Sequence, residues 1–334
     1  MKRILGMGNA LVDIMIPIEN DGILEMLELP KGSMQLVDWE RSSAIQQALK
    51  DYKKSLSAGG SAANTIHGLG KLGVPSGYIG VVGEDELGGF FVKDMINAGV
   101  DPHMIHSRKP TGCAVALVSP DSERTFATFL GAAIELSAEH LNLTPDASAV
   151  KDGIGGRLFG RYDIFHIEGY LVQNHELIET AVKLAKEAGL MVSIDLASYN
   201  VVEANKEFLH EIIEKYVDIV FANEEEAKAF TGKDPNEALH EIGGKCDIAI
   251  VKTGKEGSLV KRGKDLHNIG IIAVTPIDTT GAGDLYASGF LYGLANEKPL
   301  QECGRIGALL AGNVIEFMGS KMPEDRWINI MGEI

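Results

Sequence analysis

The chain has 334 residues, of which 45% are hydrophobic and 23% are charged, a composition that fits either one large domain with an appendage or two domains. Asp and Glu number 47 against 31 Lys and Arg, and the resulting net charge of −16 argues against general binding to nucleic acid or to an anionic membrane. Three scattered cysteines form neither a disulfide framework nor a Cys-x-x-Cys metal pair, and no apolar run is long enough to span a membrane, so we expect a cytoplasmic protein.

The N-terminal residues 1–6 are expected to form a strand, which is too short for the apolar core of a signal peptide. The following glycines, up to Gly8, suggest a dinucleotide-binding loop, but Leu11 stands where the third glycine is required and no helix start follows. That interpretation fails. Asp13 instead offers a carboxylate that can accept hydrogen bonds from two vicinal hydroxyls of a sugar.

A pair of glycines, Gly59 and Gly60, opens a predicted helix that runs to Leu72. A ligand can lie against bare backbone there, and Asn64, one turn into the helix, offers both a donor and an acceptor to hydroxyl groups. Glycine pairs also occur in plain turns and Asn also caps helices, so this pattern alone is compatible with a purely structural role.

Much of the chain alternates β-rich runs with helical stretches. Strands are expected at 77–82, 163–167, 191–195, 219–222 and 248–251, and helices at 86–98 and 175–188. This alternation predicts right-handed βαβ units and a central, mainly parallel sheet with helices on both faces. Ligands bind beyond the C-terminal strand ends of such sheets, and Asp195, Asn223 and Thr253 lie at these ends.

Two segments interrupt the alternation. Residues 13–37 carry isolated β-like runs, and residues 113–130 are typical of a hairpin. Together they can form a small β-sheet lid that excludes water from the ligand end of the main sheet; the alternative is an immobile antiparallel extension of that sheet. The predicted division is a large α/β domain of residues 1–12, 38–105 and 131–334, and a lid of residues 13–37 and 106–130.

Asn223 and Glu226 stand at the junction of the predicted strand 219–222 and the helix that follows it. Acidic residues in the first turn of a helix commonly complement the helix dipole. At a strand end that faces a phosphate group, the same two side chains can also hold Mg²⁺, through water because Mg²⁺ keeps much of its hydration shell.

The most informative segment is Asp278–Asp284, here called the anion-hole loop. It joins a predicted strand at 270–274 to an apolar helical pattern at 285–294. Small residues that enter a helix present free backbone N–H groups, which favour an anion. The carboxylate of Asp284 can take a proton from a hydroxyl beside that anion, and phosphoryl transfer to an alcohol requires this arrangement. A simple turn with a capping Asp has the same local sequence.

These segments together resemble the ribokinase-like (PfkB) family of carbohydrate kinases over nearly the whole chain. The similarity rests on four motifs: Gly59–Gly60 with Asn64, Asn223–Glu226, Val251–Gly257 and Asp278–Asp284. It implies the ribokinase-like α/β fold, with a central mainly parallel sheet flanked by helices on both faces and a small β-sheet lid. Three local features are similar to adenosine-kinase-like members: residues 8–13, 32–38 and 123–133.

The resemblance also implies a role for each matching residue. Asp284 is implied as the catalytic base, with the backbone amides of Gly281, Ala282 and Gly283 as the anion hole. It implies that Asp13, Gly59, Gly60 and Asn64 bind the acceptor. The further contacts that we predict for the acceptor are Asn9, Phe126 and the base Asp284. Those implied on the nucleotide side are Asn223, Thr253, Gly254, Gly257, Gly281 and Gly283. Glu226 is implied for Mg²⁺ through water, and Asp278, Thr280 and Ser320 for K⁺.

The implied reaction transfers the γ-phosphoryl group of ATP to a primary hydroxyl of a ribonucleoside, with adenosine favoured. Leu36, Phe126 and Phe129 can form an apolar slot for its base or simply pack the lid on the sheet, and Arg124 can neutralise phosphate or cap the lid turn. Alternatives are a ribose- or fructose-type sugar kinase, a sugar-phosphate kinase and a non-catalytic nucleoside- or sugar-binding regulator. A homodimer that pairs through the lid is a further expectation, whereas nucleic acid and membranes are not expected as partners.

Overall fold

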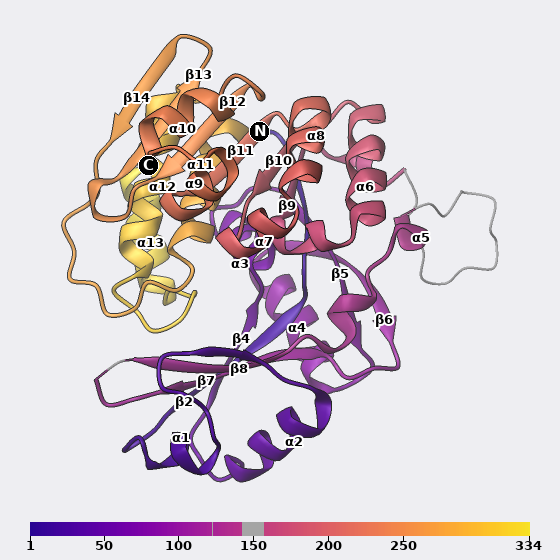
Figure 1. Cartoon of the computed structure of the whole chain (residues 1–334), viewed down its shortest axis with the longest axis vertical. Helices are drawn as coiled ribbons and strands as arrows, with labels where there is room; N and C mark the ends of the chain where they lie inside the picture. Colours follow the sequence, from indigo (N-terminus) through magenta and orange to yellow (C-terminus); the bar gives the residue numbers. More distant parts are fainter. Residues whose placement is uncertain (122, 142–156) are drawn as a thin grey trace.

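The computed structural model describes residues 1–121, 123–141 and 157–334. Strands within these ranges form one sheet of nine strands and a separate sheet of five. The two sheets belong to a larger and a smaller body that lie one above the other in Figure 1. Among the described residues, the helices are all too short or too polar to cross a membrane.

The large sheet confirms the expected parallel core. In spatial order its strands are β14 (Asp265–Ile269), β13 (Ser258–Arg262), β12 (Ile248–Lys252), β11 (Ile219–Asn223), β10 (Met191–Asp195), β9 (Ile164–Glu168), β1 (Ile4–Met7), β5 (Ser76–Gly83) and β6 (Val100–Ser107). Neighbours from β12 to β6 pair in parallel, and β12, β13 and β14 form an antiparallel extension. The C-terminal ends of β9 to β12 therefore meet at one edge of the sheet.

Helices cover both faces of the large sheet, as the alternation predicts (Figure 1). Successive strand residues point to opposite faces, so Ile4 packs in one core and Leu5 in the other. The first face carries α3 (Ser61–Lys71), α4 (Glu86–Asn97), α11 (Ala282–Ala295) and α12 (Leu300–Val314). The second carries α6 (His175–Glu187), α8 (Lys206–Tyr216), α9 (Glu224–Thr231) and α10 (Pro235–Ile242). A further helix, α13 (Glu324–Glu333), packs against the α12 side.

The small sheet is a separate unit and contains the expected hairpin. Its order is β3 (Met34–Leu36), β8 (Arg124–Phe129), β7 (Gly112–Val118), β2 (Leu11–Pro17) and β4 (Ser55–Gly59). Helices α1 (Gly22–Met26) and α2 (Trp39–Ala48) cover one face, where Ile14, Val115 and Ile45 are buried. The predicted boundary at residue 38 is wrong for β4, because this strand pairs with β2. The short polar run Ser55–Ser57 conceals that strand in the sequence.

The predicted strand at 270–274 is also wrong. Strand β14 ends at Ile269, and the chain then leaves the sheet edge without regular pairing. The β-branched residues of 270–274 do not pair in the sheet. Ile272 instead packs on the α12 side beside Gly312. The backbone hydrogen bonds go there too, because the amides of Ile277 and Asp278 both donate to the carbonyl of Ile315. This contact anchors the start of the anion-hole loop on the end of α12.

Candidate active site

The anion-hole loop delivers Asp284 to the first turn of α11, within the larger body. The Asp284 carboxylate is held on both oxygens: Ser61 Oγ donates to Oδ1 at 2.7 Å and Asn64 Nδ2 donates to Oδ2 at 2.9 Å. Both donors belong to the first turn of α3, so the two glycine-rich segments meet at this carboxylate. The turn itself requires Gly281, whose φ is +75° and whose added Cβ would stand 2.7 Å from Cβ of Ser320.

The electrostatic setting of Asp284 suits a base. Burial, assisted by the charge of Asp195, raises the pKa of Asp284 to about 6, while the bonds from Asn64 and Ser61 and the charge of Lys252 act in the opposite direction. A carboxylate with that pKa is ionised at neutral pH and still binds a proton more readily than an ordinary Asp. General bases work best when their pKa lies near the operating pH.

The residues predicted for the acceptor converge around Asp284. The Asp13 carboxylate packs directly on Gly59, where an added Cβ would stand 2.5 Å from Oδ2. Burial raises the pKa of Asp13 to about 6, and the charge of Asp284 contributes to that increase. Asn64 accepts at Oδ1 from Ser320 Oγ at 2.9 Å and from Lys321 Nζ at 3.2 Å. Two carboxylates, an amide and an ammonium group therefore share one partly buried site.

Gly60 and Asn9 are joined by a close backbone approach. Gly60 has a φ of +102°, and a Cβ there would overlap the carbonyl oxygen of Asn9. Asn9 is held in turn by Glu168 at the end of β9, which accepts from the Asn9 amide at 2.9 Å and from Asn9 Nδ2 at 2.6 Å. The same carboxylate accepts from the amide of Ala62 in α3 at 2.9 Å. Burial raises the pKa of Glu168 to about 7.

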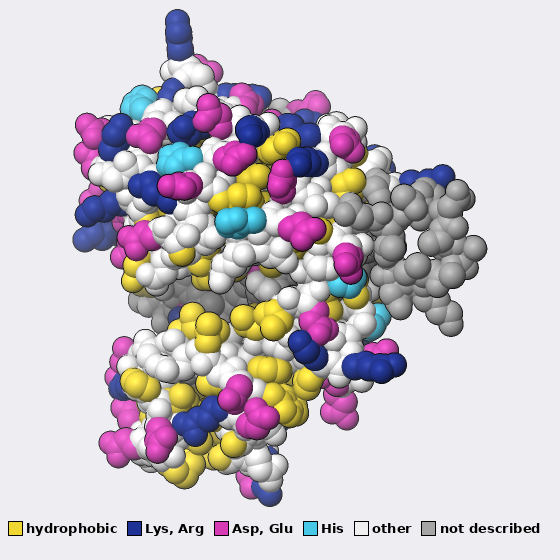
Figure 2. Space-filling model, turned by 45° about the vertical axis from the view of Figure 1, so that its right-hand side comes forward, with side chains coloured by type: hydrophobic (Ala, Val, Ile, Leu, Met, Phe, Trp, Pro, Cys, Tyr) yellow, Lys and Arg dark blue, Asp and Glu magenta, His cyan; other side chains and the backbone are white. Residues whose placement is uncertain are grey.

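The small sheet turns one face toward this site. Strand register places Asp13, Phe126 and Arg124 on the same face, which is opposite to α1 and α2. Arg124 spans the two bodies: its guanidinium lies 2.5 Å from Oδ1 of Asp278 and donates to Oγ1 of Thr280. Figure 2 shows hydrophobic side chains on the smaller body along the waist between the two bodies.

The predicted apolar slot is only partly formed by the expected residues. Phe126 lies on the site face, and the Arg124 guanidinium lies 5.4 Å from its ring centroid. Leu36 pairs with Thr128 of β8, lies on the same face and is 67% exposed. Phe129 points to the other face, where its ring packs 5.5 Å from Trp39 of α2. Phe129 is three residues beyond Phe126 on one strand, so period-two alternation puts the two rings on opposite faces.

The nucleotide-side residues lie at the ends of β11 and β12. Asn223 and Glu226 form a capping box on α9: Asn223 Oδ1 accepts from the Glu226 amide at 2.8 Å, and the Glu226 carboxylate accepts from the Asn223 amide at 2.8 Å. Thr253 donates its amide to the Gly257 carbonyl at 2.8 Å, which closes a tight turn. Gly254 and Gly257 take φ values of +53° and +97°, so this turn depends on glycine.

The capping box decides whether Glu226 can bind Mg²⁺ directly or only through water. Glu226 Oε1 accepts from Asn223 Nδ2 at 2.7 Å, so both carboxylate oxygens are already engaged. In the described part of the chain there is no group of three His, Cys, Asp or Glu side chains able to cage a metal. The donor set therefore fits a hydrated ion held chiefly by nucleotide phosphates, with Glu226 as an outer acceptor.

The residues predicted for K⁺ do not fit a cation in this arrangement. Asp278 accepts from the Thr280 amide at 2.7 Å and from the Gly319 amide at 2.6 Å, in addition to its ion pair with Arg124. Ser320 directs its hydroxyl to Asn64. A guanidinium already occupies the position beside Asp278 and Thr280, and it would repel a second cation.

Four residues in the site had no role in the sequence interpretation: Ser61, Glu168, Lys252 and Lys321. Glu168 and Lys252 each end a parallel strand, where ligands bind in such sheets, and this position could have identified both from the sequence. Ser61 lies directly after the glycine pair. Lys321, whose pKa burial lowers to about 8, lies in a C-terminal segment with no sequence pattern that points to Asn64.

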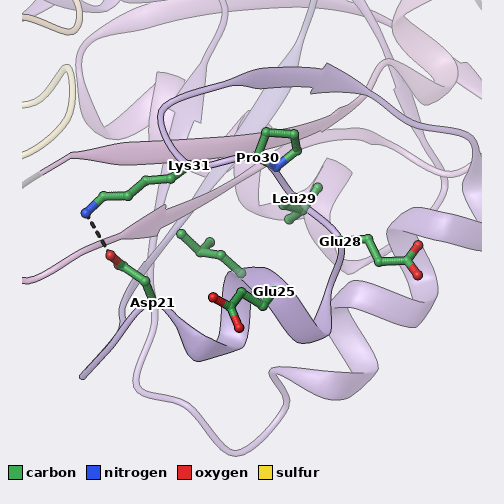
Figure 3. Close-up of a pocket in the computed structure, with 7 residues that line it drawn as sticks. Asp21, Glu25, Glu28, Leu29, Pro30 and Lys31 are labelled. Carbon is green, nitrogen blue, oxygen red and sulfur yellow. Dashed lines mark hydrogen bonds and ion pairs between the residues drawn. The ribbon is translucent and has the colours of Figure 1, made fainter.

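A separate hollow lies on α1 and the segment that leads to β3 (Figure 3). Its lining is confined to residues between Asp21 and Lys31, and the Lys31 ammonium pairs with the Asp21 carboxylate at 2.8 Å across it. None of the site residues described above contributes to this lining. The hollow is therefore distinct from the candidate site at the strand ends of the large sheet.

The model of the pfkB family of carbohydrate kinases matches residues 34–326. The chain belongs to this family. It is therefore an ATP-dependent kinase of sugars or nucleosides, from a family that usually uses Mg²⁺ with ATP. The expected ribokinase-like fold and family membership are both confirmed.

Similar proteins include kinases with different acceptors. The kinase is 26% identical to adenosine kinase 2 of Arabidopsis thaliana over 96% of both chains, and 27% identical to 5-dehydro-2-deoxygluconokinase of Geobacillus kaustophilus over 77% of this chain and 78% of that one. Among solved structures, adenosine kinase from Sinorhizobium meliloti has a TM-score of 0.85 and 31% identity, with 100% of this chain and 99% of that chain covered. A probable sugar kinase from Rhizobium etli has a TM-score of 0.84, also at 31% identity and with the same coverage.

Proposed function

We propose that this kinase transfers the γ-phosphoryl group of ATP to the primary hydroxyl of a ribonucleoside, with adenosine as the leading acceptor. The observation that carries the proposal is the Asp284 carboxylate, which lies at the start of α11 and is held by Ser61 and Asn64. Two features support the proposal: a carboxylate with a raised pKa lies at a helix N-terminus, which favours an anion, and the charge of Asp284 acts on the nearby Asp13 carboxylate, which can bind hydroxyls.

Each part of the site then has a chemical task. The amides of Gly281 and Gly283 bind oxygens of the transferred phosphoryl group, and that of Ala282 joins them when it leaves the Thr279 carbonyl, to which it donates at 3.2 Å. Asp284 accepts the proton of the attacking hydroxyl. Asp13 and Asn64 orient the acceptor's hydroxyl groups. Glu226 and Asn223 would hold a hydrated Mg²⁺ through water, and that ion would neutralise phosphate charge when it is bound with ATP. Thr253, Gly254 and Gly257 line the nucleotide side.

The preference for a nucleoside rests on the small sheet. Phe126 and Leu36 give its site face apolar surface suited to a flat base, whereas a free sugar would leave that surface exposed to water. The similarity to the Sinorhizobium meliloti adenosine kinase supports this acceptor. The equally similar probable sugar kinase makes a ribose- or fructose-type acceptor the alternative. We further propose that the small sheet acts as a lid and that two copies pair along one of its edge strands.

An acceptor panel tests the proposal directly. Adenosine, other ribonucleosides, ribose, fructose and sugar phosphates are compared by ATP-dependent product formation. Adenosine is expected to give the highest kcat/KM. Phe126→Ala is expected to raise the KM for adenosine by about 5- to 150-fold and to leave any activity with ribose unchanged, because loss of a base–aromatic stack costs about 1–3 kcal/mol. Turnover of ribose or fructose with no nucleoside turnover would establish the sugar-kinase alternative. Acceptor binding without ATP consumption would indicate a regulator.

Arg124 leads to a prediction about monovalent cations. Because its guanidinium lies beside Asp278 and Thr280, wild-type activity is expected to stay within about twofold when KCl is replaced by NaCl or a Tris salt. Arg124→Ala leaves the buried Asp278 without its counter-charge, so this variant is expected to be slow and to recover in part with K⁺. The measurement is initial rate against KCl concentration for both proteins. Strict K⁺ dependence of the wild type would contradict the prediction.

Free thiols support the cytoplasmic location that we propose. Cys113, Cys246 and Cys303 are unbridged, and two of them are buried. A reducing compartment keeps such thiols in this state.

A further inference from the structure

Lys252 ends β12 at the edge of the large sheet that carries the active site. Its Nζ lies 2.7 Å from Oδ2 of Asp195. Asp195 ends β10, which is two strands away from β12 in the sheet. The two side chains are only 15% and 7% exposed. A lysine ammonium so far from solvent is costly to bury unless it is paired, and the pair holds it in one position.

That position is beside the anion-hole loop. The backbone of Gly283 passes so close that an added Cβ would stand 3.1 Å from Nζ of Lys252. Gly283 lies in the first turn of α11, where amide groups lack helical partners and point toward a bound anion. An anion on these amides would therefore lie within reach of the ammonium group.

The charges around Lys252 indicate what it compensates. Asp195, Glu226 and Asp284 all act on Lys252. Burial by itself lowers the pKa of Lys252, but the charges of these carboxylates outweigh burial and hold that pKa above its ordinary value. Lys252 thus stays protonated at neutral pH. Three carboxylates would repel a polyphosphate, so an anionic ligand at this edge needs a fixed positive charge.

A purely structural role for the pair is the competing explanation. Buried ion pairs contribute little net stability, because the desolvation of both charges offsets their attraction. A strand end could be closed as well by an apolar residue, as at the ends of many buried strands. The close approach to Gly283 distinguishes this lysine from a simple partner of Asp195.

We propose that Lys252 is a further catalytic residue, whose ammonium donates hydrogen bonds to the transferred phosphoryl group. This inference rests on the proposed phosphoryl transfer at the anion-hole loop. In the transfer, the bond from the γ-phosphorus to the β,γ-bridging oxygen breaks and a bond to the acceptor oxygen forms. The acceptor proton passes to Asp284. Lys252 keeps its protons and is unchanged at the end of the step, so its contribution is electrostatic.

The test uses single and double variants of the full-length enzyme. Lys252→Met is expected to lower kcat at least about 10²-fold, the size of effect seen when one donor to a developing charge is removed. Lys264→Met, on the exposed turn between β13 and β14, is the matched control and is expected to leave kcat unchanged. Thermal melting of each variant reports whether it is folded.

The double variant Lys252→Met with Asp195→Asn separates the two explanations. It removes the charge of Asp195, the direct partner that the single variant leaves unpaired, so it also serves if the single variant fails to fold. If Lys252 acts on the phosphoryl group, the double variant stays at least about 10²-fold slow although it is folded. Recovery to within threefold of wild-type kcat would show that Lys252 only neutralises Asp195, and the proposal would be overturned. A folded Lys252→Met with near wild-type kcat would overturn it as well.

The proposed function fails by a different result. If Asp284→Asn retains wild-type kcat, Asp284 is not the base and the proposed mechanism at this loop fails, whatever the Lys252 variants show. If Asp284→Asn is inactive and Lys252→Met is active, only the role of Lys252 is wrong.

Discussion

Replacing Asp284 with Asn is expected to lower kcat by at least about 10²-fold, since a positioned general base contributes about 10²–10⁴-fold to rate. The amide is nearly isosteric with the carboxylate and can still accept from Ser61 Oγ, although its NH₂ group then faces the Asn64 Nδ2 donor. This mismatch is local, so the fold and ATP binding should persist. The amide cannot take the acceptor proton. Steady-state kcat and the Kd of a non-hydrolysable ATP analogue are the measurements.

The pH profile adds an independent check on the same residue. Asp284 acts as a base only when ionised, and its pKa is raised to about 6, chiefly by burial. Activity should therefore be fully present above that pKa and fall as pH decreases through about 6, rather than near 4 as for an exposed Asp. Asp265→Asn, on the exposed start of β14, is the control and should leave both the rate and the profile unchanged. An Asp284→Asn enzyme within threefold of wild-type kcat would remove Asp284 from the mechanism.

Gly60→Ala is expected to reduce kcat/KM for the acceptor at least about 10²-fold, the scale associated with a misplaced substrate of about 1 Å. The added Cβ would overlap the Asn9 carbonyl, and the φ of +102° is itself unfavourable for Ala. Either Asn9 or the start of α3 must move, and Ser61 and Asn64, which hold Asp284, move with α3. The KM for the acceptor should rise more than the KM for ATP.

Gly73→Ala supplies the matched control for that substitution. Gly73 follows the same helix at its other end and also has a positive φ, +76°, but an added Cβ there meets nothing within 4 Å. Both variants store backbone strain of about 1–3 kcal/mol, so both should melt earlier than wild type. Only Gly60→Ala should lose acceptor affinity. Equal kinetic losses in the two variants would show that strain in α3, and not the Asn9 overlap, controls the site.

The sequence was sufficient for the parallel core, because the strands that build it are buried runs bounded by clear helical patterns. It was insufficient where tertiary contacts decide the local structure. The run after Ile269 has strand-forming residues, yet Ile272 packs on the α12 side. The amides just beyond the run, those of Ile277 and Asp278, bond to the carbonyl of Ile315 at the end of α12. In the same way Ser55–Gly59 is too polar to suggest a strand, and its pairing partner β2 lies far back in the chain.

The candidate site residues also fall into two groups, those in local sequence motifs and those that only tertiary contacts bring to the site. Asp284, Asn64 and the glycines belong to contiguous motifs and could be identified from local sequence. Glu168 and Lys321 act through partners that are distant along the chain, Asn9 and Asn64, so only the fold brings their charges to the site. The engagement of Asp278 by Arg124 depends on how the two bodies meet, which no local pattern encodes.

One consequence follows from the assignment of β4 to the small sheet. Strand β4 ends at Gly59 and α3 begins at Ser61, so a single residue separates the smaller body from the helix that orients the base. If the small sheet rocks as the proposed lid, we expect the chain to twist at Gly60 and the distance from Ser61 to Asp284 to change. Such a lid would couple arrival of the acceptor under the small sheet to the orientation of the proposed base, and this coupling would spare ATP from transfer to water while the acceptor is absent.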